Sequence, residues 1–492
     1  MVGLSCSRGL LQATKYYYTP TKYEESRRRQ WIRDCLIQQL STYYHAYEGL
    51  NLVPELWRLI VDELQQCYSV ANARSLWAPS RILCSSITTA ESIWCGFVEF
   101  EGIVYVSSLS NAYSEQAPRL ISLHIDYPSE YLLVVENHLG ITKLLLASSR
   151  ESLAVDNTPG LWWRTIRFGS GELTIDVESD GIKLRRLTSG QQGSTAWDIP
   201  EPSQVRFHSF INDSHRPVPA RMASFKCNNP ATNGYSLLWA SGLVLFHAHT
   251  AGEDMSFYQS APYACWLYMP TDHDEIIIEV WQRKAWATRD RAVATNKGRI
   301  FVGGAYLKQR SLQPFVLVER LSRETSRIFF EDSTDSIGTL AFASDAPRAE
   351  NLTFIYPQPS RNRVYVTTED FFFSSHRLEG LAEIIPLIIK DRAGVSGMLL
   401  LFSDGHRESV GQVRLDSLDP SVAVGDAHSW FLAFGRMDGK YPYVTALGTT
   451  RSEVERDSDL VLQLFHDGTL EWIWSHRQCL VIYEGQKSLE TV

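Results

Sequence analysis

The spacing of apolar residues changes near residue 92, and this change constrains the fold of the chain more than any other feature. Between residues 22 and 80, apolar side chains recur at the spacing of a helix, with Glu, Arg and Gln between them. From about residue 92 onward, apolar and polar residues alternate, or β-branched and aromatic residues form short runs between Gly, Pro and Ser. The pattern predicts a small helical N-terminal head followed by a chain that is mainly β.

Asp-Gly pairs recur along the β-like part of the chain. Such a pair supplies the positive φ that tight hairpin turns need, so we interpret each as a turn between strands and not as a chemical site. The pairs are Asp180-Gly181, Asp404-Gly405, Asp438-Gly439 and Asp467-Gly468.

The length of the chain and its prolines predict several domains. At 492 residues, the chain exceeds what one hydrophobic core usually organises. Prolines crowd together in segments 200–230 and 345–362, as expected of boundaries between domains. The predicted parts are a helical head over 1–90, a β-rich domain over 91–215, a second β-domain over 220–345 and a C-terminal β-rich region over 360–492.

The charge balance argues against nucleic acid as a partner, because the formal net charge is −9. The short basic run Arg27-Arg28-Arg29 lies on a predicted helix, and we interpret it as a solvated face. No apolar run approaches the roughly 18 residues needed to span a bilayer. We therefore expect neither a nucleic-acid nor a membrane partner.

The eight cysteines lie far apart, and no two form a C-x-x-C pair. Closely spaced cysteines would be needed for a structural zinc site or a redox motif, and eight in so long a chain are no disulfide scaffold. The first residues lack the continuous apolar segment of a secretory signal. The expectation is a reduced, cytoplasmic protein.

Common cofactor motifs are absent from the sequence. There is no G-x-S-x-G nucleophile elbow, no G-x-x-x-x-G-K-[ST], no G-x-G-x-x-G after a strand and no H-E-x-x-H. We therefore expect no cofactor, and any catalysis has to rely on positioning and on general acid–base groups.

The strongest local candidate for such groups is the segment ASGLVLFHAH, residues 240–249. On a strand, His247 and His249 lie on the same face as Leu243 and Leu245. Two histidines at this spacing can be metal ligands, an acid–base pair or polar groups of a core. A metal would need a third ligand, which Asp254, Asp272 or His273 could supply, but no spacing rule selects one. The candidate catalytic residues are His247, His249, Asp272 and His273, and no metal is assigned.

Aromatic residues crowd the same region. They are Tyr235, Trp239, Phe246, Phe257, Tyr258, Tyr263, Trp266, Tyr268, Trp281 and Trp286. Aromatic residues are favoured in strands, so a β-core is one interpretation. The other is a pocket that stacks an apolar or aromatic small molecule. For that pocket, the candidate ligand-binding residues are Trp239, Tyr258, Trp266 and Trp281.

Two segments resemble the jacalin-type β-prism lectins. The first is DEIIIEVWQRKAWATRDRAVATNKGRIFVGG, residues 274–304, and the second is IFFEDSTDSIG, residues 328–338. The resemblance implies a jacalin-like β-prism, or a related β-rich domain, that binds ligands with loops at one end. Asp335 matches the Asp that holds sugar hydroxyls in such lectins, whereas Asp332 stands where the family has Gly. This departure weakens the expectation of carbohydrate binding.

The segment LVPELWRLIVDEL, residues 52–64, resembles the opening helix of an F-box. Pro54 suits the first turn of a helix, and Leu56, Leu59, Ile60 and Leu64 form an apolar stripe. An F-box continues into two more helices, but residues 65–80 lack their pattern. The resemblance therefore makes a Skp1-type adaptor a conceivable but disfavoured partner.

The combination of an F-box-like head, a jacalin-like region and further β-domains resembles a family of fungal proteins. The segments WWRTIRF, SDGIKLR, ASGLVLFHAH and GMLLLFSDGHRESVGQVRLD also carry this resemblance. Some such proteins act in secondary metabolism, including hetero-Diels–Alderases. The resemblance implies a cofactor-free lyase and cyclase that dehydrates and cyclises an apolar or aromatic molecule. The alternative is a non-enzymatic F-box-like substrate adaptor or a lectin-like ligand-binding protein.

Overall fold

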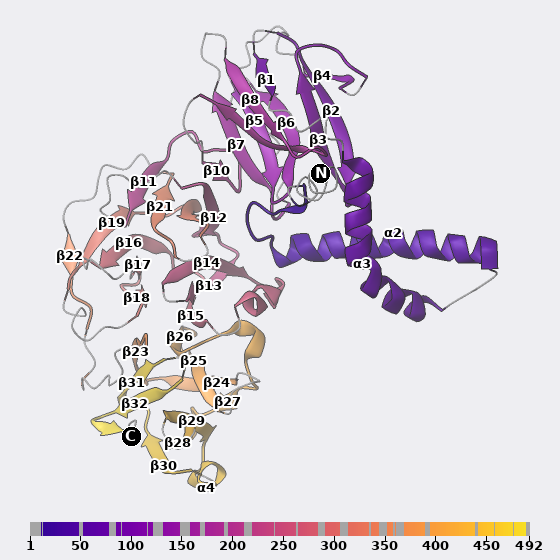
Figure 1. Ribbon diagram of the computed structural model, residues 1–492. Helices are drawn as coiled ribbons and strands as arrows, with labels where there is room; N and C mark the ends of the chain where they lie inside the picture. The colour runs from indigo at the N-terminus through magenta and orange to yellow at the C-terminus, as the bar shows by residue number, and fades with distance from the viewer. Residues whose placement is uncertain are drawn as a thin grey trace. The chain divides into compact units, whose positions relative to one another are not determined.

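The computed structural model confirms that the protein is mainly β with a helical N-terminal part (Figure 1). By contacts, the chain divides into two compact units: Met1–Ser203 with Pro217–Met222, and Gln204–Arg216 with Ala223–Val492. The structure describes residues 11, 13–48, 53–77, 85–89, 91–115, 117–121, 131–147, 158–167, 173–190, 195–210, 219–240, 242–261, 264–283, 291–305, 313–333, 336–343, 352–357, 360, 369–388, 394–437, 441–456, 458–475 and 477–488. Asp335, Tyr263, Trp286 and the Asp438-Gly439 pair lie outside the described residues.

The two long helices of the first unit are α2 (Lys22–Glu48) and α3 (Pro54–Leu76). Pro54 occupies the first turn of α3, as its sequence predicts. The helices pack through Ile32, Leu36 and Val61. Of the predicted stripe on α3, Leu64 packs against this cluster, whereas Leu56, Leu59 and Ile60 are exposed. Most of the apolar face recognised in the sequence is therefore not the face that holds the two helices together.

Within α2, Arg28 differs from the solvated face predicted for the basic run. Its guanidinium binds the buried carboxylate of Glu101 and the hydroxyl of Tyr16. Arg27 and Arg29 are exposed as expected. One of the three arginines therefore attaches the helix to the strands of its own unit.

Mostly antiparallel strands make up the rest of the first unit. Their orders are β1-β8-β9, β3-β2-β4 and β10-β7-β5-β6, and the first two residues of β12 pair with β10. Ile87, Leu132 and Leu184 belong to their shared apolar core. The bounds are β1 Ser85–Thr88, β2 Ile93–Phe100, β3 Ile103–Ser110, β4 Arg119–Ile121, β5 Tyr131–Asn137, β6 Gly140–Ala147, β7 Trp162–Arg167, β8 Thr174–Ser179, β9 Leu184–Ser189, β10 Ala196–Trp197 and β12 Arg221–Cys227.

The second unit begins with strands that order as β11-β21-β20-β12, where β12 belongs to this unit from Ala223 onward, β14-β13-β15 and β18-β17-β16-β19-β22. Apolar side chains from all three groups, such as Phe342, Tyr235 and Val280, meet in one core. The bounds are β11 Arg206–Ser209, β13 Thr232–Trp239, β14 Leu243–Thr250, β15 Cys265–Pro270, β16 Ile277–Arg283, β17 Arg291–Thr295, β18 Ile300–Gly303, β19 Phe315–Arg320, β20 Ser326–Glu331, β21 Thr339–Phe342 and β22 Thr353–Phe354.

The C-terminal part of the second unit adds the orders β23-β31-β32-β33 and β27-β24-β25-β29-β28-β30, with β26 paired to β25. Leu400 and Trp472 belong to the same apolar core as Tyr235, so regions 220–345 and 360–492 share a core. The bounds are β23 Phe372–Arg377, β24 Leu381–Ile388, β25 Val395–Phe402, β26 Arg407–Gly411, β27 Val422–Ala423, β28 Trp430–Met437, β29 Tyr441–Gly448, α4 Arg451–Val454, β30 Leu460–Leu464, β31 Thr469–Trp474, β32 Cys479–Tyr483 and β33 Gln486–Lys487.

The described Asp-Gly pairs give mixed outcomes. Asp180-Gly181 and Asp404-Gly405 lie between paired strands, β8–β9 and β25–β26, and both glycines have positive φ. The hairpin prediction is wrong for Asp467-Gly468, which joins β30 to β31 in a different sheet. A turn dipeptide fixes the local reversal but does not decide which strands pair.

Candidate functional site

The site lies on the sheet formed by β13, β14 and β15. The strand register pairs Ser236 with His247 and with Tyr268, and it pairs Gly234 with His249. Paired residues of neighbouring strands project to the same face. The predicted placement of His247 and His249 on one face of a strand is confirmed, since their ring centroids lie 4.8 Å apart.

A short turn after β14 brings a carboxylate back to the two histidines. Gly252 has φ +77, a left-handed conformation that glycine adopts without strain. The next residue is Glu253, and the 3-10 helix η2 (Met255–Ser260) then begins, with Asp254 accepting from the backbone N–H of Ser256. The turn therefore places Glu253 beside residues only four and six positions earlier.

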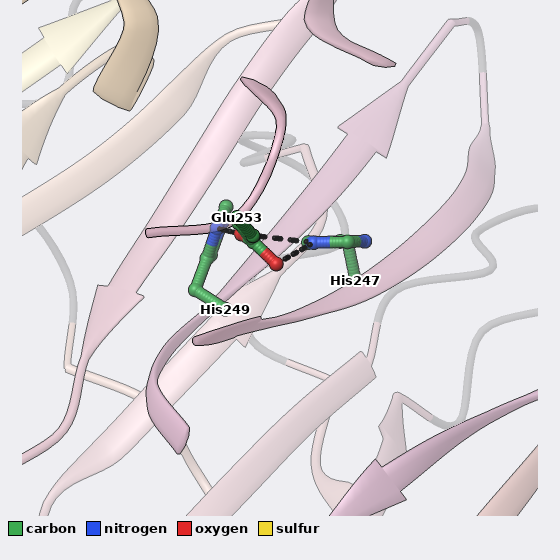
Figure 2. Close-up of side chains that lie close together, drawn as sticks. All are labelled: His247, His249 and Glu253. Carbon is green, nitrogen blue, oxygen red and sulfur yellow. Dashed lines mark hydrogen bonds and ion pairs between the residues drawn. The ribbon is translucent and has the colours of Figure 1, made fainter. Parts of the chain in front are cut away.

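Glu253 lies between both imidazoles (Figure 2). Its two carboxylate oxygens are each 3.1 Å from Nε2 of His247, and Oε1 is 2.5 Å from Nδ1 of His249. One donor atom from each of the three residues lies within 4.8 Å of the other two.

A buried chain of hydroxyl groups continues from the far side of His249. Nε2 of His249 lies 2.7 Å from Oγ of Ser236, which lies 2.9 Å from the hydroxyl of Tyr258. Ser236, His249 and Tyr258 are all fully buried. The hydrogen bonds therefore run without a break from the interior to Glu253.

The electrostatics define one proton arrangement. Burial, together with the neighbouring His247, lowers the pKa of His249 to about 4, although Glu253 opposes the shift. His249 is neutral near pH 7 and carries one ring proton. The hydrogen-bond network assigns that proton to Nδ1, which donates to Glu253, while Nε2 accepts from Ser236. Burial also raises the pKa of Tyr258, so its phenol stays protonated and can donate to Ser236.

Aromatic rings hold the two imidazoles in place. The ring of Phe257 stacks on His247 with centroids 4.1 Å apart, and Tyr268 meets His249 edge-on at 5.5 Å. Burial raises the pKa of Tyr268 to about 12, so this residue is also neutral. Ring packing therefore limits the rotation of both histidines.

Exposure divides the cluster into two ends. The side chain of His247 is 29% exposed and that of Glu253 is 16% exposed, whereas the side chain of His249 is 0% exposed. His247 and Glu253 therefore form the outer end of the cluster, which solution can reach, and His249 forms its buried inner end. Ser236, His249 and Glu253 follow the order of a nucleophilic triad, but the burial of Ser236 keeps its hydroxyl from a substrate.

The other predicted catalytic residues lie apart from this cluster. Asp272 forms an ion pair with Lys297 at 3.2 Å. His273 is an exposed turn residue. The residue that joins the two histidines as the third polar group of the site is therefore Glu253, which the sequence analysis did not identify. The available signal was Gly252 directly before it, because a glycine that follows a predicted strand favours a reversal of the chain.

The four predicted ligand-binding aromatics do not form one pocket. Tyr258 and Trp266 pack together in one cluster, Trp239 belongs to the main core and Trp281 to a third cluster. All four are buried. Nε1 of Trp239 donates to Asp370 at 2.8 Å. The described contacts match the β-core interpretation of these residues.

The described residues of the second unit line cavities, and two of them differ in their lining. One, of about 30 Å³ and lined by apolar side chains such as Phe225 and Ile328, has room for about one water. The other, of about 230 Å³, has a polar lining that includes Arg299, His376 and Glu408. Neither is lined by His247 or Glu253.

Comparisons with known proteins identify no family. No protein-family model and no curated protein matches the chain. Among solved structures, the chain has a likeness to the WD40 domain of SCAP from fission yeast, with 11% identity over 76% of this chain and 91% of that chain, at a TM-score of 0.12. A likeness at this level carries no argument about fold. In the described part of the chain, no helix is both long and apolar enough to cross a bilayer.

Proposed function

We propose that this protein is a cofactor-independent enzyme that uses general acid–base chemistry on an apolar or aromatic small molecule. The proposed reaction is a dehydration followed by cyclisation, of the hetero-Diels–Alder type, in fungal secondary metabolism. The observation that carries the proposal is the contact of the half-exposed His247 with Glu253, backed by the buried His249.

Dehydration needs one group that takes a proton from carbon and one that gives a proton to the departing hydroxyl, which leaves as water. Imidazole and carboxylate groups perform these roles when they lie within hydrogen-bond reach of the substrate. We assign the role of acid to His247 and that of base to Glu253. A following cycloaddition requires orientation but no further proton, so a shaped apolar surface such as that of Phe257 is sufficient.

The proposal gives His249 a positioning role. The histidine is fully buried and its lowered pKa keeps it neutral, so it is poorly suited to deliver protons to a substrate. Its Nδ1–H group instead holds one oxygen of Glu253. The sequence suggested two equivalent histidines, whereas the differing exposure of the rings supports two different tasks.

The resemblance to fungal proteins is part of the same proposal, as is a jacalin-like prism over 220–345. Three groups of strands around one core support the prism. We also propose a cytoplasmic protein whose partner is a small molecule, with no nucleic-acid or membrane partner. The net charge of −9 supports the exclusion of nucleic acid.

One observation favours a second function, that of an F-box-like adaptor. Leu56, Leu59 and Ile60 of α3 expose an apolar face that a helical partner could cover. Residues 65–76 continue the same helix instead of starting the further short helices of an F-box. We therefore expect no stable complex with a Skp1-type protein, and co-purification of the two at micromolar affinity would favour the adaptor instead.

The acid–base proposal can be tested without knowing the substrate. Purified protein, kept in a metal chelator, is incubated with a small-molecule extract of the cells that carry the gene, and mass spectrometry detects compounds that lose water. His247→Gln and Glu253→Gln should each lower the rate of product formation by about 10²-fold or more. His273→Gln, a change at an exposed histidine, is the matched control. Equal rates for all four proteins would refute the assignment.

A further inference from the structure

We propose that His247, His249 and Glu253 also form a binding site for a divalent transition-metal ion, with Zn²⁺ as the favoured ion. The site uses the same side chains as the proposed acid–base chemistry but does not depend on it. An ion bound to these atoms would occupy the lone pairs that otherwise move protons. Metal binding and cofactor-free catalysis are therefore competing states of one cluster.

The three donor atoms already converge. Zn²⁺ binds imidazole nitrogen and carboxylate oxygen at about 2.0–2.2 Å, which in a tetrahedral site separates two donors by about 3.3 Å. Nε2 of His247 is 3.1 Å from both oxygens of Glu253, and Nδ1 of His249 is 2.5 Å from Oε1. All three donor atoms lie within 4.8 Å of one another. Shifts of about 1 Å would open a site of the required size.

The surroundings of His249 match those of a metal ligand. A ligating histidine usually donates its second ring N–H to a fixed oxygen, which orients the ring. Nε2 of His249 faces Oγ of Ser236 at 2.7 Å, and this hydroxyl can accept as well as donate. The proton on Nδ1 would move to Nε2 when an ion takes the place of the hydrogen bond to Glu253.

The exposure of the cluster gives the ion a path and an open position. His247 and Glu253 are partly exposed, so an ion can reach them from solution. Three protein donors leave a fourth position for water, the arrangement of catalytic rather than structural zinc sites. The mixed set of two nitrogens and one oxygen suits zinc and its neighbours better than Ca²⁺ or Mg²⁺, which prefer oxygen alone.

The metal-free cluster satisfies its own hydrogen bonds, so the ion is not needed for folding. Binding can therefore be measured on folded metal-free protein. The probe is Zn²⁺ alone, in competition with a coloured chelator, on untagged protein in a Cys67→Ser background that removes the exposed thiol. We expect one ion per chain, and we expect His247→Gln and Glu253→Gln each to weaken binding by at least about 10–100-fold.

His406→Gln is the matched control. His406 also contacts a carboxylate, that of Asp404 at 2.5 Å, but this exposed pair has no third donor in the described groups of metal-binding geometry. The control should bind Zn²⁺ like the parent. Zn²⁺ should also raise the thermal midpoint of the parent and of the control but not of the two cluster variants.

Equal Zn²⁺ affinity in the parent and in both cluster variants would overturn the proposal, as would the absence of saturable binding to the parent. Thermal melts without metal report whether each variant is folded, and His247 and Glu253 are used because neither is fully buried. No substrate is present in this experiment. Failure of metal binding is therefore distinguishable from failure of the acid–base activity, which is measured in chelator.

Discussion

Glu253 and His249 are four residues apart in sequence, yet a carboxylate oxygen of the first lies 2.5 Å from Nδ1 of the second. The contact bridges the end of a strand and the turn that follows it. It joins a fully buried ring to a carboxylate that solvent can reach. The contact positions Glu253 beside His247 in the metal-free protein, and the stability of the protein should depend on it too.

The change Glu253→Gln should destabilise the protein by about 1 kcal/mol, because the amide offers one neutral acceptor oxygen where the carboxylate offers two charged ones to the imidazoles. The destabilisation is measured as the change in the free energy of unfolding, obtained from urea titrations. Asp404→Asn is the control, since this exposed carboxylate contacts His406 with similar geometry and should change the stability very little. Equal losses of stability in both variants would show that the buried contact stabilises the protein no more than the exposed one.

The stability of the protein should fall as the pH drops from about 6.5 to about 4. The folded-state pKa of His249 is lowered to about 4 from 6.5, so between these values the unfolded chain binds more protons than the folded one. The stability is therefore fully present above the unfolded-state pKa and declines below it. For this residue the loss is on the order of 3 kcal/mol.

Other groups titrate in the same range, and His376, whose pKa is also lowered by burial, contributes with the same sign. The contribution of His249 is therefore the difference between the parent and His249→Gln in how the unfolding free energy depends on pH. Unfolding free energies from pH 4 to pH 7 should depend less steeply on pH in the variant. Parallel curves would contradict the buried neutral state of His249.

Gly252→Ala tests the turn that places Glu253. The residue has φ +77 and an added Cβ would meet nothing within 4 Å, so the change strains the backbone without a clash. The expected destabilisation is about 1 kcal/mol, with a loss of Zn²⁺ affinity. Gly405→Ala is matched, with φ +91 and equally open space. It should lose similar stability in a denaturant titration but retain the Zn²⁺ affinity of the parent.

Lys183→Met should destabilise the first unit by about 3 kcal/mol. The fully buried ammonium lies 3.0 Å from Asp180 and 2.8 Å from the carbonyl of Ala13, and it sits over the ring of Phe100. Burial lowers its pKa to about 8, although Asp180 opposes the shift. The change leaves Asp180 buried without this partner. The double variant with Asp180→Asn should recover part of the loss in thermal melts; if it is less stable than the single variant, the lost ion pair is not the cause.

The two faces of α3 should respond differently to substitution. Leu59 is 66% exposed and Val61 is 0% exposed. Leu59→Glu should change the stability by less than about 0.5 kcal/mol, whereas Val61→Ala should lower it by about 2 kcal/mol through a cavity against α2. Thermal unfolding followed by circular dichroism measures the stability of the two variants. A larger effect of Leu59→Glu would mean that the predicted apolar stripe packs after all.

Local periodicity explains what could be predicted from the sequence. Alternation along residues 243–249 places both histidines on one face, because neighbouring side chains of a strand point to opposite sides. The partner Ser236 comes from another strand, and its position depends on a register that no local pattern encodes. Glu253 depends on the path of a turn. On α3, the apolar positions were recognisable, but tertiary packing with α2 decided which of them are buried.

The place of β11 in the chain has a consequence for synthesis on the ribosome. Residues 206–209 pair with residues 339–342 of β21, so about 130 residues must be translated before the partner strand exists. At typical translation speeds this delay is on the order of 10 s. During that time a strand edge containing Phe207 is available to other chains. Slower translation or a shortage of chaperones should therefore reduce the yield of this protein through aggregation of nascent chains.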